Sequence, residues 1–215
     1  MAISINKQLA IGNMQSDAQR LQKWMLSNFE SNIEDAVKGT IFPKNLPIAI
    51  ACQEVFYKIR FWVDHYPSDI VLQRCVFDAN GDFPGTSRSA FPANRSAFQN
   101  RYGSTFTQML IDEANNMRAM PQPDDPDGYS PANYLYKGYG IFQYDLQFVK
   151  TDEDFFLKKQ WYDIDACLTR LIKELKEKAT VTSDLRGIIR RYNGTGPAAE
   201  QYAINVMYYL DAMGQ

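Results

Sequence analysis

The stretch Leu46–Trp62, LPIAIACQEVFYKIRFW, decides the predicted fold. Pro47 fits the first turn of a helix, where its missing N–H leaves no hydrogen bond unmade. Beyond it, apolar residues recur at helical spacing in two stripes: Ile48, Cys52, Val55, Ile59 and Trp62 in the first, and Ile50, Tyr57 and Phe61 in the second. A helix that is apolar on nearly every side, but too short to cross a bilayer, is expected to run through the centre of a core.

Glu54 falls within the second stripe, at helical spacing from its three apolar members. Removal from water penalises the ionised carboxylate, so we expect the pKa of Glu54 to be raised toward neutrality. A carboxylic acid that is still protonated near neutral pH is the proton donor that cleavage of a glycosidic bond requires. The structural alternative is a glutamate at a cleft edge that pairs with Lys58 or Arg60.

The flanking sequence predicts further helices and few strands. Residues 16–37 are expected to form an amphipathic helix that is capped by Ser16 or Asp17. Other helices are predicted over residues 107–120, 184–192 and 197–213, and residues 155–178 are predicted to form one or two helices. Residues 71–77 fit either a short strand or a helical turn. The chain is therefore predicted to be mainly α, with at most a small β-hairpin, and to form a single domain over residues 1–215 in which residues 1–40 are helical scaffold.

Composition narrows the classes of partner and cofactor. The 215 residues carry a net charge of −2 and contain no basic block, so a nucleic-acid partner has no electrostatic support. No apolar stretch reaches transmembrane length, and the N-terminal residues lack the basic flank and apolar run of a secretory signal. The three widely spaced cysteines form no metal motif and allow at most one intramolecular disulfide. No metal or other cofactor is expected.

Residues 78–82, DANGD, hint at a calcium loop. The glycine is misplaced in this loop, and Ser89 stands where the closing glutamate belongs, so a turn is the better interpretation. An acyl-transfer site has little support either, because His65 is the only histidine and no Gly-x-Ser-x-Gly element is present. A pairing of His65 with Cys52 is disfavoured because Cys52 belongs to the apolar stripe.

Three separated segments together resemble one family. They are LPIAIACQEVF at 46–56, GYGIFQYD at 138–145 and RRYNGTGPAAEQYAINV at 190–206. In this order and in helical context they are similar to elements of the lysozyme-like superfamily, in particular soluble lytic transglycosylases and goose-type lysozymes. The resemblance covers most of residues 40–213. It leaves residues 64–130 unmatched, as an atypical insert.

The resemblance implies a lysozyme-like helical domain in which Glu54 is the general acid/base. It also implies that the saccharide cleft is lined by Gly138, Gly140, Gln143, Tyr192, Asn193 and Tyr202. Glycine lets a ligand approach the backbone, glutamine offers a donor and an acceptor for an N-acetyl group, and tyrosine can stack on a sugar. The structural alternatives stay open: the glycines form a hairpin, Tyr192 belongs to the core, and Asn193 shapes a turn.

The expected activity is cleavage of the N-acetylmuramic acid–N-acetylglucosamine bond of peptidoglycan. Lytic transglycosylation uses one glutamate and forms an anhydro-muramyl end, whereas hydrolysis needs a positioned water. The candidates for a second carboxylate are Asp64, Asp69, Asp78 and Asp82. The expected partners are then peptidoglycan glycan strands. The protein is expected to act at the bacterial cell envelope or outside the cell, and the sequence does not indicate its export route. We expect a monomer. The alternative is a non-catalytic module that binds glycan or a protein partner, with residues 64–130 as its docking surface.

Overall fold

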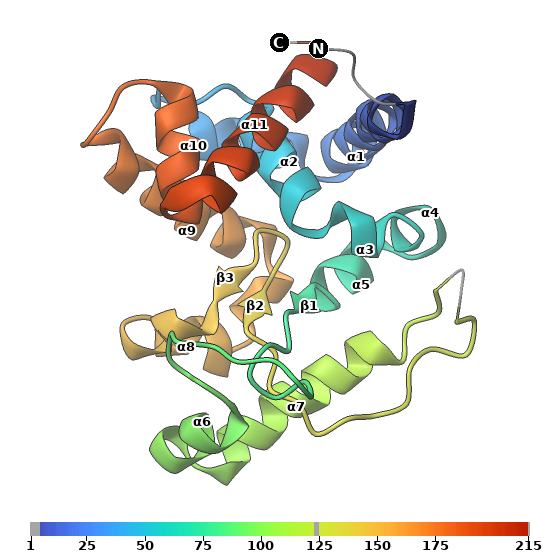
Figure 1. The fold of residues 1–215 in the computed structure, drawn as a ribbon, viewed down its shortest axis with the longest axis vertical. Coiled ribbons are helices and arrows are strands. Elements are labelled where there is room, and N and C mark those ends of the chain that lie inside the picture. The colour runs from blue at the N-terminus through green and yellow to red at the C-terminus, as the bar shows by residue number, and fades with distance from the viewer. Residues whose placement is uncertain (1–4, 123–124, 215) are drawn as a thin grey trace. The chain divides into compact units, whose positions relative to one another are not determined.

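A computed structural model describes residues 5–122 and 125–214 and confirms that the chain is mainly α, with 63% helix and 4% strand (Figure 1). The chain divides into two compact units. The first contains residues 1–63 and 168–215, and the second contains residues 64–167. The second unit begins at the predicted start of the insert but ends well beyond residue 130. The single domain with an insert at 64–130 stays a prediction.

In the first unit, helix α1 (Ile5–Val37) packs against the segment that carries Glu54 and against the C-terminal helix α11 (Gly196–Ala212). Its Leu21, Met25 and Ile33 side chains are fully buried, as the apolar spacing predicts. The helix begins before Ser16, so the predicted cap at Ser16 or Asp17 is wrong. The polar residues there lie inside a longer helix. No helix among the described residues is both long and apolar enough to span a membrane.

Residues 46–65 form a broken helix rather than the continuous one that was predicted. Its parts are α2 (Leu46–Ala51), the π-type turn η1 (Cys52–Phe56), α3 (Tyr57–Ile59) and, after a short interruption, α4 (Trp62–His65). All five members of the first apolar stripe are buried, which confirms that part of the pattern. The second stripe is buried only at its start, since Tyr57 is 61% exposed. Beyond Glu54, therefore, only the face with the second stripe turns toward solvent, while the first stripe stays in the core.

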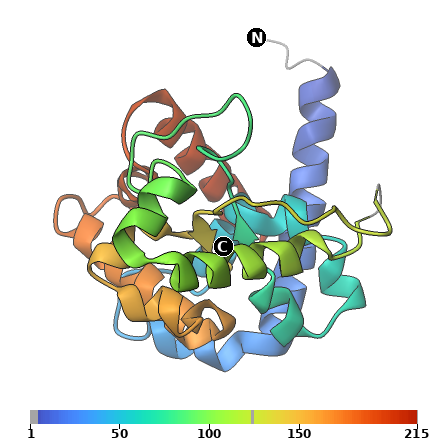
Figure 2. The same cartoon turned by 90° about the horizontal axis from the view of Figure 1, so that it is seen from below.

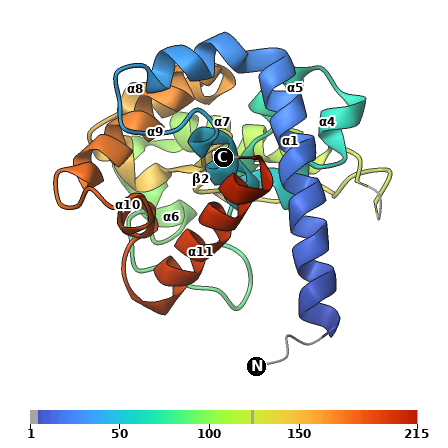
Figure 3. The same cartoon turned by 90° about the horizontal axis from the view of Figure 1, so that it is seen from above.

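The first unit resumes at residue 168. It contains most of α9 (Ile164–Ala179) and the two helices that follow, α10 (Leu185–Asn193) and α11. Helix α10 packs along α11, and Figures 1 and 3 both show the two side by side. Gly194 joins them at a φ of +125°, a backbone conformation that favours glycine. Both helices lie where the sequence predicts them.

The second unit contains a three-stranded antiparallel sheet in the order β1-β2-β3. Strands β2 (Gly138–Tyr139) and β3 (Tyr144–Asp145) form the predicted hairpin, and β1 (Val76–Phe77) pairs with β2 to add a third strand. The segment 71–77, which fits either a strand or a helical turn, contains both: α5 (Ser68–Gln73) ends within it and β1 follows.

The remaining helices of the second unit are short, apart from one. They are α6 (Arg95–Tyr102), α7 (Ser104–Arg118), η2 (Leu146–Lys150), α8 (Glu153–Leu157) and η3 (Gln160–Tyr162). Helices α6 and α7, drawn in green in Figure 2, meet at Gly103, whose φ of +85° allows the sharp turn between them.

A buried lysine organises the loop that precedes α6. Lys137 has no exposed surface, and its Nζ donates hydrogen bonds to the carbonyl oxygens of Asn80 and Ala93. Burial lowers the pKa of Lys137, while nearby aspartates oppose this shift. Residues 80–82 form a turn, as the sequence interpretation favours over a calcium loop. An ammonium group of the chain itself thus lies within this acidic loop.

Candidate functional site

Glu54 lies in the π-type turn η1 and is held by a tyrosine of α11. The Tyr202 hydroxyl donates a hydrogen bond to Glu54 Oε1 over 2.6 Å. Tyr202 is buried, and so are Cys52, Val55 and Phe56 of the same turn, whereas Glu54 keeps part of its side chain accessible. Wide turns of this type occur frequently at functional sites. The turn therefore presents one carboxyl group, in a fixed orientation, at the edge of an apolar core.

The surroundings of Glu54 hold its carboxyl near half-protonation at neutral pH. Burial raises the pKa of Glu54 from 4.5 to about 7, the hydrogen bond from Tyr202 opposes this rise, and the negative charge of Glu174 adds to it. Burial and the Glu54 charge in turn raise the pKa of Tyr202 well above 10. A carboxyl group with a pKa near 7 can give up a proton and take one back at physiological pH.

Tyr192 extends this group of side chains. Its ring lies 6.2 Å from the ring of Tyr202, centroid to centroid, at an interplanar angle of 43°. Tyr192 comes from α10 and is half-buried, so one part of the ring contacts the core and another part reaches solvent. Asn193 is the last residue of α10, and it is exposed. The structure thus brings Glu54, Tyr192 and Tyr202 together, from three separate segments of the chain.

Glu174 is the residue near this site that the sequence interpretation missed. It lies on α9, and its charge raises the pKa of Glu54. Glu174 is only half-exposed. Its position three residues after the buried Leu171, on the same face of the helix, is the signal that could have indicated a partly buried carboxylate.

The four predicted candidates for a second carboxylate all belong to the unit of residues 64–167. Asp64, Asp69 and Asp78 are exposed. Asp82 has a structural role, because its carboxylate accepts hydrogen bonds from the backbone N–H groups of Arg95 and Leu135. These four candidates stay predictions, and the carboxylate whose charge raises the pKa of Glu54 is Glu174.

The conformations of Gly138 and Gly140 are explained by packing within the second unit, and the ligand-binding role predicted for them stays a prediction. The Gly140 N–H donates to the Cys75 carbonyl over 2.8 Å, and its own carbonyl accepts from both the backbone N and the Nε2 of Gln143. Its backbone groups are therefore already bonded. A Cβ on Gly138 would lie 2.2 Å from Gln143 Oε1, so the close approach is made by the protein itself.

The backbone conformation and the close packing at residue 140 both require glycine. Its φ is +76°, and a Cβ there would lie 2.8 Å from Cys167 Sγ and 3.2 Å from Trp161 Cβ. The Gln143 side chain is directed into the hairpin, and its own φ is +51°. The hairpin alternative thus accounts for all three residues.

Two other kinds of site have little support in the structure. Within residues 5–122 and 125–214, no group of three or more His, Cys, Asp or Glu side chains is placed to hold a metal ion. The three cysteines are buried and form no disulfide within the described residues, and burial raises the pKa of the Cys52 and Cys75 thiols well above the usual range. A reactive thiolate is disfavoured at either position.

Comparison of the chain with family models, with curated proteins and with solved structures finds no match.

Proposed function

We propose that this chain is a peptidoglycan-cleaving glycosidase of the lysozyme-like type. It acts on the N-acetylmuramic acid–N-acetylglucosamine bond, with Glu54 as general acid/base. The observation that carries the proposal is the Glu54 carboxyl itself, whose pKa of about 7 results from burial in an apolar turn and whose oxygen is held by Tyr202. The resemblance of residues 46–56 and 190–206 to lytic transglycosylases and goose-type lysozymes supports the same residues.

In the proposed reaction, protonated Glu54 gives its proton to the glycosidic oxygen as the bond to the anomeric carbon breaks. The resulting carboxylate then acts as base. In the transglycosylation route it takes the proton of a hydroxyl of the same muramyl residue, which attacks the anomeric carbon and closes an anhydro ring. In the hydrolytic route it takes the proton of a water instead. Both routes return Glu54 to its protonated form.

The neighbouring side chains fit supporting roles in this scheme. Tyr202 is a positioning residue, because its hydroxyl fixes the direction of the Glu54 carboxyl. The half-buried Tyr192 ring is the candidate for contact with a sugar. Glu174 keeps the proton on Glu54 up to a higher pH, because its negative charge disfavours a second carboxylate nearby.

The experiment is lysis of purified bacterial cell walls by wild type and by Glu54→Gln, followed by mass spectrometry of the products. Glutamine keeps the shape of the side chain and can still accept the Tyr202 hydrogen bond, so the fold is retained while the proton donor is lost. We expect turbidity to fall with wild type and with the exposed control Glu177→Gln, and to stay constant with Glu54→Gln. Anhydro-muramyl ends identify transglycosylation, and reducing ends identify hydrolysis.

Two results would overturn the proposal. Full lytic activity of Glu54→Gln would remove Glu54 from the mechanism. Wall binding by wild type without any released muropeptide, across pH 5 to 8, would favour a non-catalytic module.

A further inference from the structure

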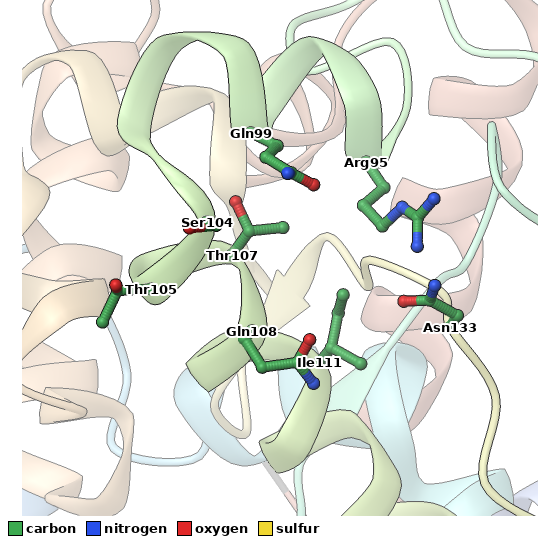
Figure 4. A pocket seen from close by; sticks show the side chains of 8 residues that line it. All are labelled: Arg95, Gln99, Ser104, Thr105, Thr107, Gln108, Ile111 and Asn133. Atoms are coloured by element: carbon green, nitrogen blue, oxygen red, sulfur yellow. The ribbon is translucent and has the colours of Figure 1, made fainter.

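A polar cavity in the second unit, lined by none of the residues assigned to cleavage, has the chemistry of a sugar site. Its volume is about 340 Å³, and it is bounded by α6, α7 and the extended segment around Asn133. Figure 4 shows the Arg95 and Gln99 side chains directed from α6 toward this space, with Ile111 rising from α7. All of these residues belong to the segment 64–130, which resembles nothing in the lytic family, or directly follow it.

The donors and acceptors of this cavity are available to a ligand. Within the described part of the chain, the side chains of Arg95, Gln99 and Asn133 make no hydrogen bond or ion pair. Gln108 uses one amide hydrogen on Asp112 and keeps its carbonyl oxygen. The lining contains no carboxylate, so it does not attract a cation.

We propose that this cavity binds an N-acetylated hexosamine unit of a glycan strand. An acetamido group combines one N–H donor, one carbonyl acceptor and one methyl group. Side-chain amides match the first two, since each offers a donor and an acceptor. Ile111 is the apolar residue of the lining, and it is 3% exposed, so it forms a small apolar floor for the methyl group. Arg95 supplies a fork of donors to ring hydroxyls.

An aromatic pair that is linked to the cavity wall through Asp82 supports the same class of ligand. Phe83 is 54% exposed, and its ring lies 6.0 Å from that of Tyr134 in an edge-to-face arrangement. The Asp82 carboxylate bonds the backbone N–H groups of both Arg95 and Leu135, each of which adjoins one of these features. The aromatic pair and the cavity wall are thus fixed to one another. Exposed aromatic rings provide the flat apolar surface on which the C–H face of a pyranose packs.

The inference rests on the proposed function only for identifying the glycan as peptidoglycan. Peptidoglycan strands consist of N-acetylated sugars throughout, so this cavity would hold the strand at a point other than the bond that is cut. A chain that holds its substrate at a second place gains avidity for the polymer but not for a short fragment.

The test is an NMR titration of the full chain carrying Glu54→Gln, with chitotetraose as the probe and maltotetraose, which lacks acetamido groups, as the comparison. We expect chitotetraose to shift the amide signals of residues 95–99, 104–111 and 133. Arg95→Ala and Asn133→Ala should each weaken this binding about tenfold, because each removes side-chain hydrogen bonds to the sugar. The matched control is Gln147→Ala, an exposed amide of η2 outside the cavity, which should bind as the parent does.

The outcomes separate this inference from the proposed cleavage. Chitotetraose shifts confined to signals outside the cavity, or equal shifts with maltotetraose, would overturn the assignment. Loss of binding counts only if the signals of the β2–β3 hairpin are unchanged, which shows that the variant is folded. Cavity shifts in a protein that lyses no cell wall would leave this inference standing while the proposed function fails. Lysis of cell walls without chitotetraose shifts at the cavity would support the proposed function and overturn this inference.

Discussion

Replacing Glu54 by glutamine should stabilise the protein at alkaline pH, because it removes a carboxylate that folding places in an apolar turn. In the folded chain the pKa of Glu54 is about 7, against 4.5 for an ordinary glutamate. A folded pKa above the unfolded one means that the folded state holds the proton more tightly. The stabilisation is therefore complete below the unfolded pKa and is lost as the pH rises through 7.

The magnitude follows from the two pKa values. Each unit of pKa difference corresponds to about 1.4 kcal/mol, so protonation of Glu54 stabilises the folded state by about 3 kcal/mol in total. About 2.5 kcal/mol of this stabilisation is lost between pH 5 and pH 8. Wild type loses this contribution over that interval, and Glu54→Gln does not. The free energy of unfolding of the variant, relative to wild type, should therefore rise by about 2.5 kcal/mol from pH 5 to pH 8.

The assay is urea unfolding of both proteins at pH 5, 6, 7 and 8, followed by tryptophan fluorescence. Trp24 and Trp62 lie in the same unit as Glu54 and report on it. Comparing the two proteins at each pH cancels the titrating groups that do not interact with Glu54. Glu177→Gln is the control, because this side chain on α9 is exposed to water in the folded protein, and its difference from wild type should stay constant. If the difference in unfolding free energy between Glu54→Gln and wild type stays constant within about 0.5 kcal/mol, or falls as the pH rises, burial does not destabilise the ionised form of Glu54 and the reasoning is refuted.

Three further variants, and one control variant, test the site and the hairpin. Tyr202→Phe removes the hydrogen bond that favours ionised Glu54, so the pKa of Glu54 should rise further in a carbon-13 carboxyl NMR titration. The free energy of unfolding should fall by about 1 kcal/mol. An unchanged or lower pKa would contradict the hydrogen bond. Glu174→Gln removes a negative charge, so the same titration should show a lower pKa for Glu54, and no change would show that the two carboxylates do not interact. Gly140→Ala combines a positive φ with a Cβ 2.8 Å from a neighbouring sulfur, so it should lower the unfolding free energy by about 3 kcal/mol. Gly85 has a similar φ, but a Cβ there would meet nothing within 4 Å, so Gly85→Ala should lower the unfolding free energy by only about 1 kcal/mol. Equal losses for the two variants would mean that close packing at Gly140 is unimportant.

Much of the first unit could be predicted from periodicity and turn residues. The stripe from Ile48 to Trp62 is buried as its spacing indicates, and α10 and α11 follow from the turn at Asn193–Pro197. The direction of the pKa shift of Glu54 also follows, since its largest cause is the burial of a carboxylate within an apolar helix. These features are local, and the residues that cause them lie within one or two helical turns of each other.

What could not be predicted depends on partners that are distant in sequence. The effect of Glu174 on Glu54 requires two helices to meet, and no spacing in either one reveals it. The same holds for Gly140, where a Cβ would meet Trp161 and Cys167. The sequence could not identify these neighbours, because a glycine indicates only that something comes close, and not whether that is a sugar or the chain itself.

The wide turn at Cys52–Phe56 makes the direction of the catalytic candidate depend on the number of residues as well as on their identity. Successive residues of an α-helix are rotated by about 100°, and a π-type turn holds roughly one residue more than regular winding needs. Deleting one residue within this turn would let the helix wind evenly, and would swing Tyr57 and everything after it by about a quarter of a circle relative to Leu46–Ala51. A shortened chain of this kind would keep its apolar composition, but the carboxyl group and the stripe from Ile48 to Trp62 would no longer point where the present fold needs them.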